Sequence, residues 1–244
     1  SNLSKIMDAA LIDFERQHAF LDPANFNQKN YRIDIIGAGA TGSYVAFQLA
    51  KMGIQGMHIW DADVVESHNL PNQLYGLADV GKLKVEALSE YLKEIAGIEV
   101  TTHNEFVNSE TGMLGDIVFL LTDTMSSRKE IYESCLKYYA TQLCIETRLS
   151  ATQGRVYAFN PTDLTDQMRW EKTLYSDEVA EKSECGTSIM MGASSSMIAS
   201  MAVWQFIKWV TKRDDTIDEK YRLANPEFEV LFSVYPNYNF LFNL

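Results

Sequence analysis

Residues 31–63 read YRIDIIGAGATGSYVAFQLAKMGIQGMHIWDAD and hold two short apolar runs separated by a glycine-rich turn. The first run, Arg32 to Ile36, is typical of a buried strand. Gly37, Gly39 and Gly42 follow it in the spacing G-x-G-x-x-G. In that spacing the first glycine permits a tight turn, the second lets the backbone approach a phosphate, and the third lets a helix pack on the strand.

The second apolar run, about Gly56 to Trp60, predicts a second strand that ends at Asp61. A carboxylate at this distance from the glycine turn accepts hydrogen bonds from ribose hydroxyls, and the helix N-terminus between the strands attracts an anion. The sequence therefore predicts an adenine nucleotide at the carboxyl ends of a parallel sheet. The alternative is a glycine turn that serves packing alone.

The segment after the second strand distinguishes between classes of nucleotide-binding protein. It carries DADVVESHNLPNQ at residues 61–73 and DVGKLK at residues 79–84, where a dehydrogenase would usually turn at once into a helix. These strings resemble D-x-D-x-V-E-x-x-N-L-x-x-Q and D-x-G-x-x-K of the ThiF/MoeB/HesA superfamily of adenylyltransferases, which are related to ubiquitin-activating enzymes. The chain looks like a minimal bacterial or phage member.

This resemblance implies a Rossmann-like α/β fold: a doubly wound, mostly parallel sheet with an antiparallel C-terminal portion. It implies that ATP activates the C-terminal carboxylate of a ubiquitin-like protein, a sulfur-carrier protein or a peptide as an acyl-adenylate, with release of pyrophosphate. The resemblance places Gly37, Gly39 and Gly42 at the phosphates, Asp61 at the ribose, Asn69 and Gln73 along the phosphate chain, and Lys84 at the developing charge. Asp63 and Asn72 also belong to its nucleotide-binding residues.

Asn72 departs from the family pattern N-L-x-R-Q, in which an arginine precedes the glutamine and contacts the γ-phosphate. An amide brings no charge to that position. Either Arg16 and Arg128 supply the missing positive charge, or the protein binds nucleotide with weakened chemistry.

After Lys84 the sequence predicts a helix and then a short third strand, Ile98 to Thr101. The apolar run Asp116 to Leu121 predicts a further buried strand, and Asp123 follows at its carboxyl end. In the family the matching aspartate holds Mg²⁺ and the arginine five residues later, here Arg128, lies beside it. Asp123 as a simple helix cap is the alternative. Arg148, after the next predicted strand, would meet either an anionic group of the substrate or a neighbouring acid.

An apolar stripe from Leu3 to Phe14 predicts an N-terminal helix, and residues 1–30 form an N-terminal helix and arm. The arm resembles the family's R-x-x-R-Q segment, with Asp13 in place of its first arginine. In the family the second arginine, here Arg16, reaches across a homodimer to the triphosphate of the other subunit. A surface salt bridge is an equally open interpretation of Arg16.

Residues 31–244 are predicted to form one adenylation domain. Its last part, EVLFSVYPNYNFLF at residues 229–242, predicts an antiparallel hairpin that turns at Pro236-Asn237. We expect its segment from about 162 to 185 to be irregular and to cross over the substrate tail. No C-x-x-C pair surrounds that segment, so no structural zinc is expected. Cys185 lies before a long predicted helix, about Ser188 to Lys212, at a place where several family members carry an acyl-accepting or sulfur-transferring cysteine. A small buried residue is the alternative for Cys185.

Composition limits the remaining classes. The net charge of −12 argues against a nucleic-acid partner, and three cysteines without a paired pattern fit a reducing, cytoplasmic location. Serines and Lys208 interrupt the long helix, which argues against a membrane span. Two other functions remain open: a nucleotide-binding scaffold that has lost catalysis, and an NAD-dependent oxidoreductase that uses the same glycine turn.

Overall fold

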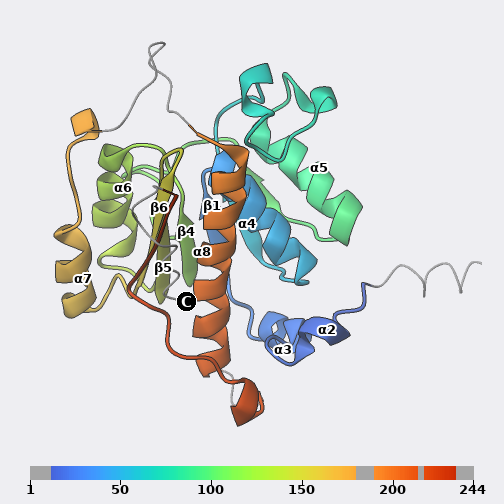
Figure 1. Cartoon of the computed structure of the whole chain (residues 1–244), viewed down its shortest axis with the longest axis vertical. Coiled ribbons are helices and arrows are strands. Elements are labelled where there is room, and N and C mark those ends of the chain that lie inside the picture. The colour runs from blue at the N-terminus through green and yellow to red at the C-terminus, as the bar shows by residue number, and fades with distance from the viewer. Residues whose placement is uncertain (1–11, 180–189, 214–216, 235–244) are drawn as a thin grey trace, which may run out of the picture.

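A mixed sheet forms the centre of the computed structural model, which describes residues 12–179, 190–213 and 217–234 (Figure 1). Its described strands lie in the order β3-β2-β1-β4-β5-β6-β7. The run from β3 to β5 is parallel, and β6 and β7 add on antiparallel. This confirms the predicted Rossmann-like fold class. The strands are β1 Ile33–Ile36, β2 Met57–Trp60, β3 Thr101–His103, β4 Ile117–Leu120, β5 Leu143–Leu149, β6 Gln153–Phe159 and β7 Glu229–Ser233.

Helices cover both faces of this sheet, with α4, α5 and α8 on one side and α6 and α7 on the other (Figure 1). The helices are α2 Glu15–His18, α3 Pro23–Gln28, α4 Ala40–Lys51, α5 Lys84–Ala96, α6 Met125–Ile131, α7 Leu164–Glu171 and α8 Gly192–Arg213. A π-helical turn, Tyr132–Leu136, extends α6, and 3₁₀ turns occupy Ser67–Asn69, Leu77–Asp79, Asp177–Val179 and Glu219–Tyr221.

The alternation of side chains along the central strands divides the core into two layers. Ile33 and Ile35 of β1 pack into the larger cluster, together with residues of α4, α5 and α8. Ile36 belongs to a second cluster with Ile131 and Trp170, on the side of α6 and α7. Strands covered on both faces in this way read as continuous apolar runs, which is why β1 and β4 could be recognised in the sequence.

Two sequence predictions about element boundaries are wrong. A strand was predicted at Ile98 to Thr101, but pairing with β2 begins only at Thr101, opposite His58. Gly97 ends α5 with φ of 65°, and the chain must first bury Ile98 before it reaches the sheet edge.

The expectation of an irregular chain from residue 162 onwards also fails, because this segment contains α7. Asp163 caps that helix by accepting hydrogen bonds from Thr165 N at 2.9 Å and Asp166 N at 3.0 Å. Gln167 and Trp170, three residues apart, form its buried face.

Several predictions fall partly or wholly outside the described residues: most of the N-terminal stripe, Cys185, the predicted start of the long helix at Ser188, and the turn of a C-terminal hairpin at Pro236-Asn237. Among the helices that are described, none combines the length and the apolar character that crossing a membrane requires.

Candidate functional site

A cavity of about 540 Å³ opens at the carboxyl edge of the sheet, next to the ends of β1, β2 and β4. β1 and β4 are neighbours, yet the chain leaves them for opposite faces, through α4 and α6. Such a switch point is where ligands bind in open α/β sheets. The described lining residues are Ile36, Gly37, Gly39, Ala40, Trp60, Asp61, Asp63, His68, Asn69, Asn72, Gln73, Lys84, Phe106, Val107, Leu121, Thr122, Asp123, Thr124, Ser127, Ile131 and Met190.

The cavity has an apolar side and a polar side. Ile36, Trp60 and Val107 line it from the core layer of α6 and α7. The segment of Asn72 lies on the other face, since Leu74 N donates to Ser43 Oγ of α4 at 3.2 Å. An apolar wall opposite a polar one suits a ligand with a flat base at one end and phosphates at the other.

The glycine turn forms the floor between these sides. Gly37 has φ of 99°, which side-chain-bearing residues rarely adopt. A Cβ on Gly42 would lie 1.8 Å from Gly37 O, so only glycine lets α4 pack this closely. A Cβ on Gly39 would meet no atom within 4 Å, although Gly39 lines the cavity. The space above Gly39 is therefore open to a ligand.

Asp61 is buried at the edge of the cavity and holds the glycine turn in place. Its Oδ2 accepts from Ala38 N and its Oδ1 from Asp63 N, both at 2.8 Å. Burial raises the pKa of Asp61, while these amides act in the opposite direction. Each carboxylate oxygen can accept a second hydrogen bond, so a ribose hydroxyl can still bind there.

Tyr75, which the sequence did not indicate, also stabilises the glycine turn. Its hydroxyl donates to Ala38 O at 2.6 Å and lies 3.4 Å from Lys84 O, at the start of α5. Burial raises the pKa of Tyr75, so the hydroxyl stays a donor.

Lys84 is the lysine of the cavity and is itself nearly buried, with its side chain 8% exposed. Its Nζ lies 2.9 Å from Asp63 Oδ2, and the Asp63 side chain is 54% exposed. A phosphate that enters the cavity would compete with a partly solvated carboxylate, which is a weak competitor.

The side-chain amides of the polar side differ in whether they already form hydrogen bonds within the chain. Asn69 Oδ1 accepts from Glu66 N at 2.8 Å and closes the 3₁₀ turn Ser67–Asn69. Asn72 Oδ1 and Gln73 Oε1 are buried and have no hydrogen-bond partner among the residues that the structure describes. Unpaired polar atoms at a cavity wall are expected where a ligand or its bound water completes the contacts.

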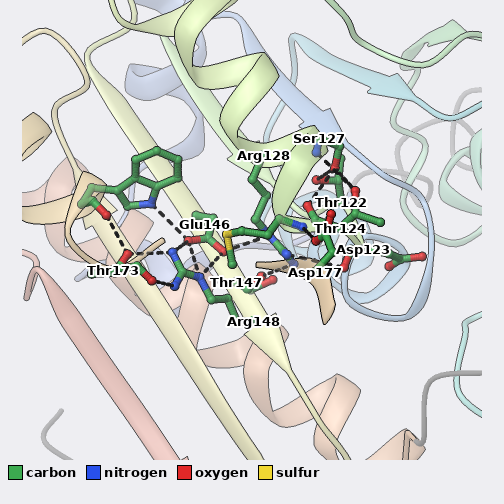
Figure 2. Close-up of polar contacts among 12 residues, drawn as sticks. Thr122, Asp123, Thr124, Ser127, Arg128, Glu146, Thr147, Arg148, Thr173 and Asp177 are labelled. Carbon is green, nitrogen blue, oxygen red and sulfur yellow. Dashed lines mark hydrogen bonds and ion pairs between the residues drawn. The ribbon is translucent and has the colours of Figure 1, made fainter. Parts of the chain in front are cut away.

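Asp123 follows β4 on the opposite rim of the cavity, next to the first turn of α6 (Figure 2). Its exposed carboxylate makes no hydrogen bond or ion pair with the described part of the chain, since Arg128 reaches only its carbonyl oxygen, at 3.5 Å. Asp177 lies beside this turn and accepts hydrogen bonds from Met125 N and from Ser126 N. Asp123 is therefore free to act as a ligand, because another residue stabilises the helix end.

Arg128 and Arg148 do not line the cavity; both turn toward the buried Glu146 (Figure 2). Arg128 Nε lies 3.0 Å from Glu146 Oε1, and Arg148 Nη2 lies 2.9 Å from Glu146 Oε2. Arg148 also donates to Thr173 O at 2.7 Å. Of the two interpretations of Arg148, the neighbouring acid is the one that the geometry shows. In this arrangement Arg128 contacts the backbone of Asp123 through its carbonyl oxygen and does not face the cavity.

Arg16 is exposed on α2, at the edge of the sheet opposite the cavity (Figure 1). The following helix α3 is held at that edge, where Asn27 Nδ2 donates to Gly53 O at 2.9 Å. Arg16 therefore cannot reach the cavity of its own chain. The two described cysteines, Cys135 and Cys144, are buried thiols whose pKa is raised by burial, which makes them poor nucleophiles.

The residues present suit a magnesium nucleotide. Mg²⁺ prefers hard oxygen ligands and is commonly held by one or two carboxylates together with phosphates and water. The free carboxylate of Asp123 can be such a ligand. Among the described residues no cluster of three or more His, Cys, Asp or Glu side chains forms a closed metal cage, so Mg²⁺ would depend on the nucleotide for its other ligands.

The fold and the cavity together define a nucleotide-binding protein of the doubly wound α/β class. Its membership is more specific: the ThiF family model matches residues 15–235, and the chain belongs to the ThiF family.

Two curated relatives illustrate this membership. "Adenylyltransferase and sulfurtransferase MOCS3" of Aedes aegypti is 34% identical over 114 residues, which cover 44% of this chain and 26% of that protein. "NEDD8-activating enzyme E1 catalytic subunit" of Caenorhabditis elegans is 35% identical over 85 residues, covering 34% and 20%. The matched segments thus span only about a quarter or less of these relatives' length.

Solved structures share the fold. PaaA superimposes with a TM-score of 0.65 at 21% identity, covering 91% of this chain and 79% of that one. Escherichia coli MccB, solved with ATP, gives a TM-score of 0.59 at 18% identity, covering 84% and 61%. At these identities the likeness concerns the fold alone.

Proposed function

We propose that this protein is an ATP-dependent adenylyltransferase that activates the C-terminal carboxylate of a peptide, a ubiquitin-like protein or a sulfur-carrier protein. The proposal rests on one observation: Gly39, Lys84 and Asp123 line the same cavity at the switch point of the sheet. Family membership adds support and favours adenylyl transfer over the oxidoreductase that the glycine turn alone left open.

In the proposed reaction an oxygen of the substrate carboxylate forms a bond to the α-phosphorus of ATP. The bond between that phosphorus and the bridging oxygen breaks, and pyrophosphate leaves with the electron pair. No general base is needed, because the carboxylate is already ionised at neutral pH. Catalysis then consists of positioning and charge stabilisation.

Each part of the cavity has a task in this reaction. The glycine turn seats the phosphates, Asp61 holds the ribose, and Lys84 leaves Asp63 to stabilise the charge that develops on the phosphates. Asn72 and Gln73 turn their amide groups toward the phosphate chain. Mg²⁺, held by Asp123 and the phosphates, would neutralise part of the triphosphate charge.

The test is the exchange of labelled pyrophosphate into ATP, with candidate tail peptides and small proteins as acceptors. Asp123→Ala should reduce exchange by about 10²- to 10³-fold, the usual loss for a missing electrostatic contact. Glu99→Ala is the matched control, because Glu99 is an exposed acid that pairs with Lys93 outside the cavity lining. Equal exchange in Asp123→Ala and wild type would contradict the proposal. ATP binding without exchange for any acceptor would favour the scaffold.

We further propose that the protein works as a homodimer in the cytoplasm, with Arg16 completing the site of the other subunit. Arg16→Ala and Asp123→Ala should each lose exchange, but a mixture of the two should recover it. In a hybrid dimer one site keeps Asp123 and receives Arg16 from its neighbour, so a 1:1 mixture should regain about a quarter of the wild-type rate. No recovery in the mixture would leave Arg16 as a surface residue.

A further inference from the structure

The cavity carries too little positive charge for the ligand we propose. Its charged lining consists of three carboxylates, Asp61, Asp63 and Asp123, and one ammonium group, Lys84, among the described residues. Lys84 is already paired with Asp63. A magnesium-bound nucleoside triphosphate still carries about two negative charges. Within one chain, binding it therefore calls for another donor or cation on the polar side, in addition to the Arg16 that we propose the other subunit supplies.

His68 is the remaining basic side chain of the described lining. It stands in the 3₁₀ turn that Asn69 closes through its hydrogen bond with Glu66 N. Its side chain is 67% exposed, and Nδ1 lies 3.5 Å from Glu66 Oε2. Glu66 can therefore hold one ring nitrogen while the other, Nε2, is left to donate to a ligand.

The position of His68 indicates which part of the ligand it would meet. It lies in the same polar segment as Asn72 and Gln73, whose amide NH2 groups can donate to phosphate oxygens. Trp60 and Val107, which line the cavity from the core layer of α6 and α7, suit a nucleobase. A ring on the polar side can reach the outer phosphates, which leave as pyrophosphate, and lies away from the base.

On the assumption that the proposed function holds, we propose that His68 binds the β- and γ-phosphates and neutralises charge that Asn72 cannot. Its role is selective for the triphosphate. AMP, which has only the phosphate that stays with the acyl group, makes no contact with His68. Pyrophosphate, the leaving group, does make that contact.

Calorimetric titration with a non-hydrolysable ATP analogue, with AMP and with pyrophosphate tests this selectivity. His68→Ala should lower the affinity for the ATP analogue and for pyrophosphate about 10-fold, which is the effect of losing one charge-assisted hydrogen bond. AMP affinity should stay at the wild-type value. Lys93→Ala is the matched control, because Lys93 is an equally exposed basic residue that pairs with Glu99 outside the cavity lining.

A second pair of variants separates charge from structure. His68→Arg should retain triphosphate affinity, and His68→Ala combined with Asn72→Arg should regain it, since position 72 lines the same cavity. If His68 only stabilised its turn, His68→Ala would lower the affinities for the ATP analogue and for AMP equally, and Asn72→Arg would restore neither affinity. That result would overturn the inference. Wild-type affinity of His68→Ala for the ATP analogue overturns it as well. Failure of the wild type to bind either nucleotide would overturn the proposed function and this inference together.

Discussion

Gly39 and Gly42 lie in the same turn, and the structure predicts opposite consequences of adding one methyl group to each. At position 42 the new Cβ would lie 1.8 Å from Gly37 O, and at position 39 it would have no atom within 4 Å. The obstruction at position 42 is backbone. No side-chain rotation relieves it, so either the turn or α4 must move.

Gly42→Ala should therefore lower the free energy of unfolding by about 3 kcal/mol or more, at the upper end of overpacking costs. Gly39→Ala should change it by less than about 1 kcal/mol, because removing a glycine also restricts the unfolded chain. Nucleotide affinity of Gly39→Ala should nevertheless fall roughly 100-fold, because the methyl group occupies the space into which a phosphate would fit.

Urea denaturation followed by circular dichroism gives the free energy of unfolding, and calorimetry with an ATP analogue gives the affinity. Gly97→Ala is a control for glycine replacement in general. Its φ of 65° should cost about 1 kcal/mol without any change in affinity, since it ends α5 away from the cavity lining. The reasoning is refuted if Gly39→Ala binds the analogue like the wild type, or if Gly42→Ala unfolds at the wild-type midpoint.

Three further outcomes are expected. Glu146→Ala leaves two buried guanidinium groups without their acid and should cost about 3–5 kcal/mol in urea denaturation, against about 1 kcal/mol or less for the partly exposed Glu171→Ala. Burial raises the pKa of Asp61 above 3.8, so ionisation of this group opposes folding. The free energy of unfolding should therefore fall as the pH rises from 3.8 through the raised pKa. Asp61→Asn should remove this dependence in denaturation at successive pH values. Lys84→Ala should reduce pyrophosphate exchange by about 10²-fold yet leave the urea midpoint nearly unchanged, because its partner Asp63 is half-exposed.

The parts of the site that depend on local spacing could be predicted from the sequence. The glycine turn follows a continuous apolar strand, and Asp61 ends the next one, so both positions are determined by short-range geometry. Lys84 and Asp123 were found through a family resemblance, because 38 residues separate them (84 to 123, both excluded) and no periodicity links them. The structure brings both to the cavity lining.

The parts that depend on distant contacts were missed. Asp177 lies 52 residues from Met125, and Tyr75 lies 37 residues from Ala38, so no local pattern indicates either hydrogen bond. The direction of Arg128 depends on Glu146, a buried acid that a strand pattern does not explain. His68 did carry a signal, since it stood within the recognised polar segment, but its value appears only when the charges around the cavity are counted.

The buried group of Glu146 with Arg128 and Arg148 has a consequence for how this lineage can change. Loss of Glu146 leaves two buried cations unpaired, and loss of either arginine leaves the acid only partly compensated. Each single substitution therefore gives a destabilised protein. Replacing all three by well-packed apolar residues removes that penalty. The three positions should therefore vary together among relatives, and a homologue with a small residue at position 148 should also show a different partner, or none, for the acid at position 146.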